Sequence, residues 1–152
     1  NDEALSLPYE RVVGLLGEVA EPWERHPSRF SVTRVCNYAA SRGSVRLLKW
    51  ARENNRAWST QTCRYAAQNG HLSVLKYLHE NGCPWDRHSC SSAAGKGHLP
   101  VLKYLHETGC PWDLGTCLHA AHNKQWDCLQ YAVDNKCQAW KMYAKNHAEH
   151  LR

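Results

Sequence analysis

Cysteines that recur at a fixed interval of 27 residues constrain the fold of this chain more than any other feature. The four are Cys36, Cys63, Cys90 and Cys117, and the amino-acid sequences that surround them are similar. The two middle copies are nearly identical over residues 71–86 and 98–113. A repeat of this length predicts a stack of supersecondary units, each of which buries its apolar face only against its neighbours.

The spacing of apolar residues within one repeat is helical. Residues such as Leu72, Leu75 and Leu78 fall on one side of a helix, which predicts a helix over about residues 71–81 that Gly82 can end. A helix is also predicted over about 87–96, because Asp86 can accept hydrogen bonds from its first free amides. No segment alternates as a strand would. The sequence therefore predicts two helices in each repeat and an all-α fold for the chain.

The repeat resembles the ankyrin repeat in the order Ala-Ala-x-x-Gly-His-Leu-x-Val-Leu-x-x-Leu-x-x-x-Gly-Cys, found at residues 66–83 and again at 93–110. The resemblance covers about residues 33–140. It implies a solenoid of helix-turn-helix repeats with helical caps, which binds another protein. The usual Thr-Pro-Leu-His opening is absent, and the period of 27 is shorter than the typical ~33. We therefore expect the hairpin fingers of the family to be shortened or absent.

The repeat divides the chain into a capping region at each end and four repeats between them. The expected units are 1–32, an N-terminal capping helix and linker; the repeats 33–59, 60–86, 87–113 and 114–140; and 141–152, a C-terminal capping helix. In the first unit Leu5, Val12, Leu15, Leu16 and Val19 have helical spacing. The only methionine is Met142, so we expect the sequence to be a part of a longer chain. The alternative that we expect is a monomer.

The 8 cysteines and 10 histidines allow three interpretations: zinc ligands, disulfides or small core residues. His79, Cys83 and Cys90 form a possible zinc-ligand set that recurs one repeat later. The first repeat has Arg52 and Arg56 at two of these places, which favours core thiols. We expect no metal, no cofactor and an intracellular protein, cytoplasmic or nuclear, since buried thiols persist in reducing compartments.

Two further residue types recur with the repeat. The resemblance implies that His71 and His98 hydrogen-bond the turn between helices. Trp58, Trp85 and Trp112 follow the end of the second helix in each repeat. We expect these tryptophans to wedge between repeats, and a platform for a ligand remains an alternative.

Positions that vary between repeats are free to bind a partner, because positions that recur maintain the stack. On the first helix of each repeat, the residues two before, two after and five after the cysteine point away from the buried side. This first-helix ridge predicts a protein interface on a concave surface, and a mixture of Tyr, His and Arg suits such an interface. Its candidate residues are Arg34, Tyr38, Ser41, Gln61, Tyr65, Gln68, His88, Ser92, His119 and His122.

The charge of +5 is concentrated in one part of the chain. Residues 1–32 contain three basic and six acidic residues, whereas residues 33–62 contain six basic and one acidic. An acidic partner or a nucleic acid could bind the basic first repeat. Packing of that repeat against the acidic N-terminal segment explains the charge better. The arginines concerned are Arg34, Arg42, Arg46, Arg52 and Arg56.

Other function classes have little support in the sequence. The chain has no glycine-rich phosphate loop, no Gly-x-Ser-x-Gly and no His-Glu-x-x-His, so we do not expect an enzyme. No run of 18 apolar residues predicts a membrane span. The segment Leu7-Pro8-Tyr9-Glu10, with Val13 and Leu16, is faintly similar to the start of an F-box. Substrate recognition for a ubiquitin ligase is therefore a further alternative.

Overall fold

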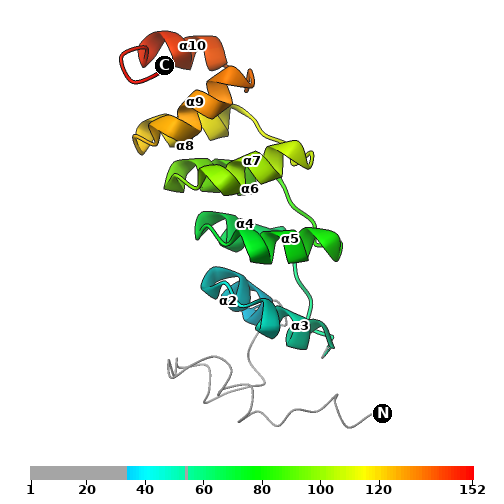
Figure 1. Ribbon diagram of the computed structural model, residues 1–152. Helices are drawn as coiled ribbons and strands as arrows, with labels where there is room; N and C mark the ends of the chain where they lie inside the picture. Colours follow the sequence, from blue (N-terminus) through cyan, green and yellow to red (C-terminus); the bar gives the residue numbers. More distant parts are fainter. Residues whose placement is uncertain (1–33, 54) are drawn as a thin grey trace.

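The computed structural model describes residues 34–53 and 55–152, and its regular elements there are all helices, as predicted (Figure 1). The N-terminal capping region 1–32 and the F-box-like residues within it lie outside the described residues. The helices are α2 (Arg34–Arg42), α3 (Val45–Glu53), α4 (Thr60–Gln68), α5 (Leu72–Glu80), α6 (Arg87–Lys96), α7 (Leu99–Glu107), α8 (Leu114–His122), α9 (Trp126–Asp134) and α10 (Trp140–Asn146).

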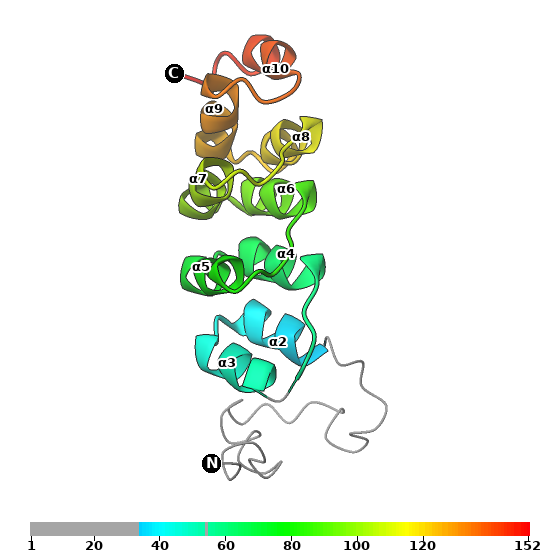
Figure 2. The same cartoon turned by 90° about the vertical axis from the view of Figure 1, so that its right-hand side faces the viewer.

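The helices form two layers. The first helices of the repeats, α2, α4, α6 and α8, follow one another on one side, and the second helices, α3, α5, α7 and α9, follow one another on the other (Figure 2). The first helices pack against one another more closely than the second helices do. The stack is therefore shorter along the first-helix layer than along the second-helix layer.

The core lies between the layers and repeats with the sequence. In the second repeat, Cys63, Ala66 and Ala67 of α4 and Leu75 and Leu78 of α5 are completely buried. Their counterparts in the third repeat, residues 90, 93, 94, 102 and 105, are completely buried as well. Small residues on the first helices allow the close packing of that layer, whereas leucines fill the space under the second helices. The core therefore runs through the described repeats without interruption.

A histidine connects each middle repeat to the repeat before it, at the turn between the two helices. Nε2 of His71 donates to the carbonyl of Ser41, and Nε2 of His98 donates to that of Gln68, both at 3.0 Å. The ring of His98 lies so close to Gly70, whose φ is +74°, that a Cβ there would be 2.6 Å from Nδ1. Glycine is needed at this turn both for its left-handed backbone and for its lack of a side chain.

The starts of the first helices have the predicted caps. Asp86 Oδ1 accepts from the amide of His88, and Asp113 Oδ1 accepts from that of Gly115, both at 2.9 Å. In the second repeat the amide of Ser59 donates to Oγ1 of Thr62 at 3.1 Å. These bonds satisfy backbone groups that the first turn of a helix leaves open.

The last helix is shorter than predicted. The sequence predicts a capping helix through residue 151, but α10 ends at Asn146. His147 stacks on Tyr143, and His150 stacks on Trp126 of α9 with ring centroids 4.0 Å apart. Because these contacts direct the last residues back toward α9, the chain cannot continue along the axis of α10.

Buried hydroxyl groups face the preceding repeat, and they differ in their hydrogen bonding. Thr62, Ser89 and Thr116 occupy the same position in successive repeats and are completely buried. Oγ1 of Thr62 donates to Oδ1 of Asn37 at 2.7 Å, whereas the hydroxyls of Ser89 and Thr116 have no hydrogen-bond partner.

Replacing Thr116 by valine should leave the protein equally stable or stabilise it by up to about 1 kcal/mol, because the change removes an unpaired buried hydroxyl without changing the volume. The matched change Thr62→Val should destabilise it by about 1–2 kcal/mol, because Asn37 and the amide of Ser59 lose their partner. Chemical denaturation of both variants measures the difference. Equal effects of the two substitutions would contradict this account of the hydroxyls.

Candidate functional site

The ten predicted residues of the first-helix ridge lie on α2, α4, α6 and α8, and none of them is buried. The exposed ones are Arg34, Gln61, Tyr65, His88, His119 and His122, and the half-buried ones are Tyr38, Ser41, Gln68 and Ser92. The cysteine and the two small residues after it on each first helix face the core instead, apart from the half-buried Ala121. The six exposed residues therefore point away from the core, whereas Tyr38 packs partly against it, and the assignment of the ridge to a partner stays a prediction.

The half-buried ridge residues also hold the turns between helices. Oγ of Ser41 donates to the carbonyl of Tyr38 at 2.8 Å. The carbonyls of Ser41 and Gln68 accept the hydrogen bonds from the histidines of the next repeat. Because these acceptors are main-chain carbonyls, substitutions of Ser41 and Gln68 would keep the histidine bonds. The exposed Gln61, Tyr65, His88 and His119 are better placed to contact a partner.

Two exposed leucines on α8 were not predicted as part of the site. Leu114 and Leu118 are 39% and 48% exposed, which makes them comparable with Tyr65 at 41%. They lie one turn apart on the same helix, where the third repeat has Arg87 and Ser91. A comparison of the repeats at every position of the first helix would have found them, because both positions change from polar to apolar. Together with Tyr65 they give the first-helix layer exposed apolar area.

The recurring tryptophans are packed against side chains of the protein. The ring of Trp85 stacks on His79 with centroids 4.0 Å apart, and Trp112 stacks on His106 at 3.9 Å. Trp112 also meets Tyr131 of the next repeat edge-on at 6.1 Å. One face of Trp85 and one face of Trp112 are therefore covered by a histidine of the same repeat, and Arg52 lies over a face of Trp58.

The cysteines are all free and buried, as expected for core thiols. Cysteines that are 20 residues apart in the sequence lie together in pairs, and this spacing was not part of the prediction. The thiols of Cys63 and Cys83, of Cys90 and Cys110, and of Cys117 and Cys137 interact with each other. This pairing and burial raise the pKa of Cys83, Cys90 and Cys117. Pairing with Cys117 lowers the pKa of Cys137, whose Sγ donates to the carbonyl of Asp113 at 3.0 Å.

The possible zinc-ligand set of the sequence does not come together. His79 stacks on Trp85, Cys83 pairs with Cys63, and Sγ of Cys90 lies 4.0 Å from the carbonyl of Cys110. Within residues 34–53 and 55–152, no three side chains of His, Cys, Asp or Glu are grouped as a metal site requires.

The arginines of the basic first repeat are all exposed. Arg52 has a structural role, because its guanidinium lies 4.2 Å from the ring centre of Trp58 and Nη1 donates to the carbonyl of Arg56 at 3.3 Å. Arg46 lies on α3 and Arg42 at the end of α2. Basic charge therefore surrounds the end of the stack at which α2 and α3 lie (Figure 1).

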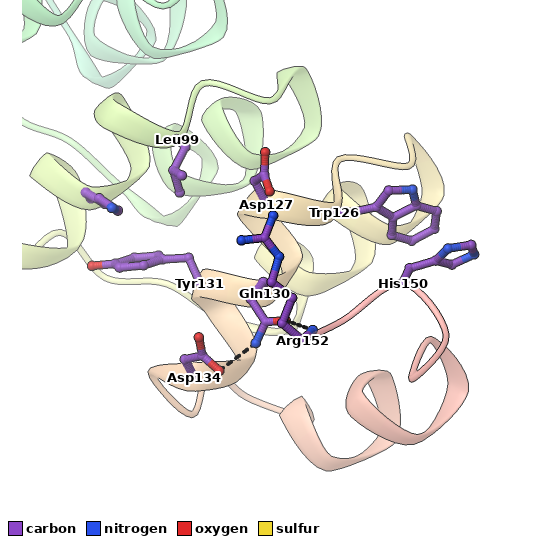
Figure 3. A pocket seen from close by; sticks show the side chains of 9 residues that line it. Leu99, Trp126, Asp127, Gln130, Tyr131, Asp134, His150 and Arg152 are labelled. Atoms are coloured by element: carbon purple, nitrogen blue, oxygen red, sulfur yellow. Dashed lines mark hydrogen bonds between the residues drawn. The ribbon is translucent and has the colours of Figure 1, made fainter.

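A shallow groove of about 210 Å³ lies beside α9, and the C-terminal residues form part of its wall (Figure 3). The amide of Arg152 donates to Oε1 of Gln130 at 2.5 Å, and Nε2 of Gln130 donates to Oδ1 of Asp134 at 2.7 Å. Lys103 and Asp127 also line the groove, so its wall contains both signs of charge. The groove was not predicted, because it depends on how the last residues turn back.

No family model matches the chain, and no curated protein matches it. None of the helices in the described part of the chain is both long enough and apolar enough for a bilayer crossing.

Proposed function

We propose that the chain is an ankyrin-like solenoid that binds a protein partner, reversibly and without catalysis, on the first-helix ridge. One observation carries the proposal: exposed residues that differ from repeat to repeat stand on a buried framework that recurs. Gln61 and Tyr65 of α4 become His88 and Ser92 of α6, while the buried cysteine and alanines stay in place.

The composition of the ridge supports a protein as the partner. Tyr65, Leu114 and Leu118 offer apolar area, and His88 and His119 offer hydrogen-bonding groups on the same layer. Interfaces derive most of their affinity from a few aromatic or apolar residues surrounded by polar ones. Close packing of the first helices supports a concave first-helix layer, on which one partner could touch several repeats.

The proposal is tested with the double variant Tyr65→Ala/His119→Ala. The full chain is used as bait in a lysate of its source, and captured proteins are quantified by mass spectrometry. We expect capture of the main partner to fall by about tenfold or more, which corresponds to ~1.4 kcal/mol of binding free energy. The unfolding free energy should change by less than about 0.5 kcal/mol per substitution, because both side chains are exposed.

The control is Glu80→Ala/Glu107→Ala, which changes two exposed residues on the second helices. The control should capture as much partner as the natural sequence. If the ridge variant keeps full capture, or if both variants lose it equally, the assignment of the partner to the first-helix layer is wrong.

A further inference from the structure

At one end of the described stack, α2 and α3 have an outer face on which no other described repeat packs. In later repeats the corresponding face packs against the preceding repeat, so its contacts indicate which positions such a face uses. In the second repeat Thr62 bonds Asn37 of the repeat before it at 2.7 Å. In the fourth repeat the hydroxyl of Tyr131 and Nδ1 of His106 lie 2.9 Å apart. Asp127 lines the groove between α7 and α9. These three positions therefore face the preceding repeat.

The first repeat has different residues at the same three positions. Val35 replaces the buried threonine or serine, Trp50 replaces the tyrosine, and Arg46 stands where the fourth repeat has Asp127. Val35 and Trp50 are half-buried and pack against the core. The outer face of the first repeat is thus more apolar and more basic than the faces that other repeats use for stacking, which suits a partner that is apolar and acidic.

We propose that residues 5–19 of this same chain dock on the outer face of α2 and α3. This segment has leucines and valines at helical spacing, and it carries two acidic residues, Glu10 and Glu18, and one basic residue, Arg11. Its apolar stripe complements Val35 and Trp50, and its glutamates complement Arg46. The inference does not depend on the ridge or on its partner.

Chain length permits this docking. Residues 20–33 connect the segment to Arg34, at the start of α2, and 14 extended residues reach up to about 45 Å. Pro8 can begin a helix, and a helix over residues 8–19 would be about 18 Å long, enough to cover α2 and its nine residues, which span about 13 Å. The segment can therefore return to the face from which the chain emerges.

Hydrogen–deuterium exchange of the full chain, read by mass spectrometry, tests the proposal. We expect amides of residues 5–19 to exchange at least about tenfold more slowly than in a free peptide of residues 1–32. Arg46→Glu and Leu15→Asp/Leu16→Asp should each remove most of this protection. The matched control Ser73→Glu, at the position of Arg46 in the second repeat, should leave the protection unchanged.

Each other result would overturn the proposal. Exchange as fast as in the free peptide would show that the segment does not dock. Protection that persists in both Arg46→Glu and Leu15→Asp/Leu16→Asp would show that residues 5–19 dock on another surface. Protection that rises with protein concentration would show that the segment binds a second copy of the chain instead of its own first repeat.

Discussion

Raising the pH from 8 to 10 is expected to lower the free energy of unfolding by several kcal/mol, because the buried thiols that keep their protons in the folded state outnumber Cys137, whose lowered pKa has the opposite effect. Burial raises the pKa of Cys36, and burial with pairing raises the pKa of Cys83, Cys90 and Cys117. Unfolded thiols lose their protons near pH 8.5–9, so above this pH the folded state binds more protons than the unfolded state. Stability is then fully present below the unfolded pKa and falls as the pH rises.

Cys128 provides a quantitative control, because burial raises its pKa to about 11 and it has no thiol partner in its own repeat. Val74 and Val101 occupy the same position in the preceding repeats, so Cys128→Val should cost less than about 1 kcal/mol at pH 7. Between pH 9 and pH 10 the variant should lose about 1 kcal/mol less stability than the natural sequence.

Guanidinium denaturation at pH 7, 8, 9 and 10, with a reductant present, measures both effects. Stability that is constant over this range, or an identical decline in Cys128→Val, would show that the buried thiols do not control the alkaline behaviour.

Replacing Gly70 by alanine is expected to destabilise the protein by about 3 kcal/mol. The backbone there has a φ of +74°, which costs an alanine about 1–2 kcal/mol. The new methyl group would also collide with the ring of His98, so the hydrogen bond to the carbonyl of Gln68 would be lost. Losing a buried hydrogen bond adds about 1–2 kcal/mol.

Gly82 is the matched control. Its φ of +75° is nearly the same, but a Cβ there would meet no atom within 4 Å. Gly82→Ala should therefore show only the backbone cost of about 1–2 kcal/mol. Equal losses in the two variants, measured by denaturation at pH 7, would mean that the histidine contact contributes nothing to stability.

The pattern of the sequence predicted the helices well because it reports burial. The spacing of Leu72, Leu75 and Leu78, followed by Gly82, predicted α5 to within one residue at each end. The helix over Arg87–Lys96 was predicted with the observed bounds, because Asp86 and Gly97 mark both ends. These signals act over a few residues along the chain, so a single sequence contains them.

The sequence was less informative about which buried groups meet. The thiol pairs, such as Cys90 with Cys110, depend on how the end of a second helix folds back onto the first helix. The early end of α10 depends on the stacking of His150 on Trp126, which lies in another repeat. Both are contacts across space, and helical periodicity reports which side of a helix is buried without naming its neighbour. The exposed positions of the ridge could be predicted from the helical period, and Leu114 and Leu118 could have been found by comparing the remaining first-helix positions of the repeats, because both change from polar to apolar.

The turn of the fourth repeat departs from the rule that the other turns follow. Lys124 has a φ of +58° where other repeats have glycine, and Gln125 replaces the histidine that reaches back to the preceding repeat. A second lysine, Lys136, also has a positive φ, of +54°. These positive-φ residues lower the stability of the fourth repeat, although α8 packs closely against α6. Because each unit in such a stack is held by its neighbours, a partner that spans α4 and α8 would also stabilise the fourth repeat against local opening.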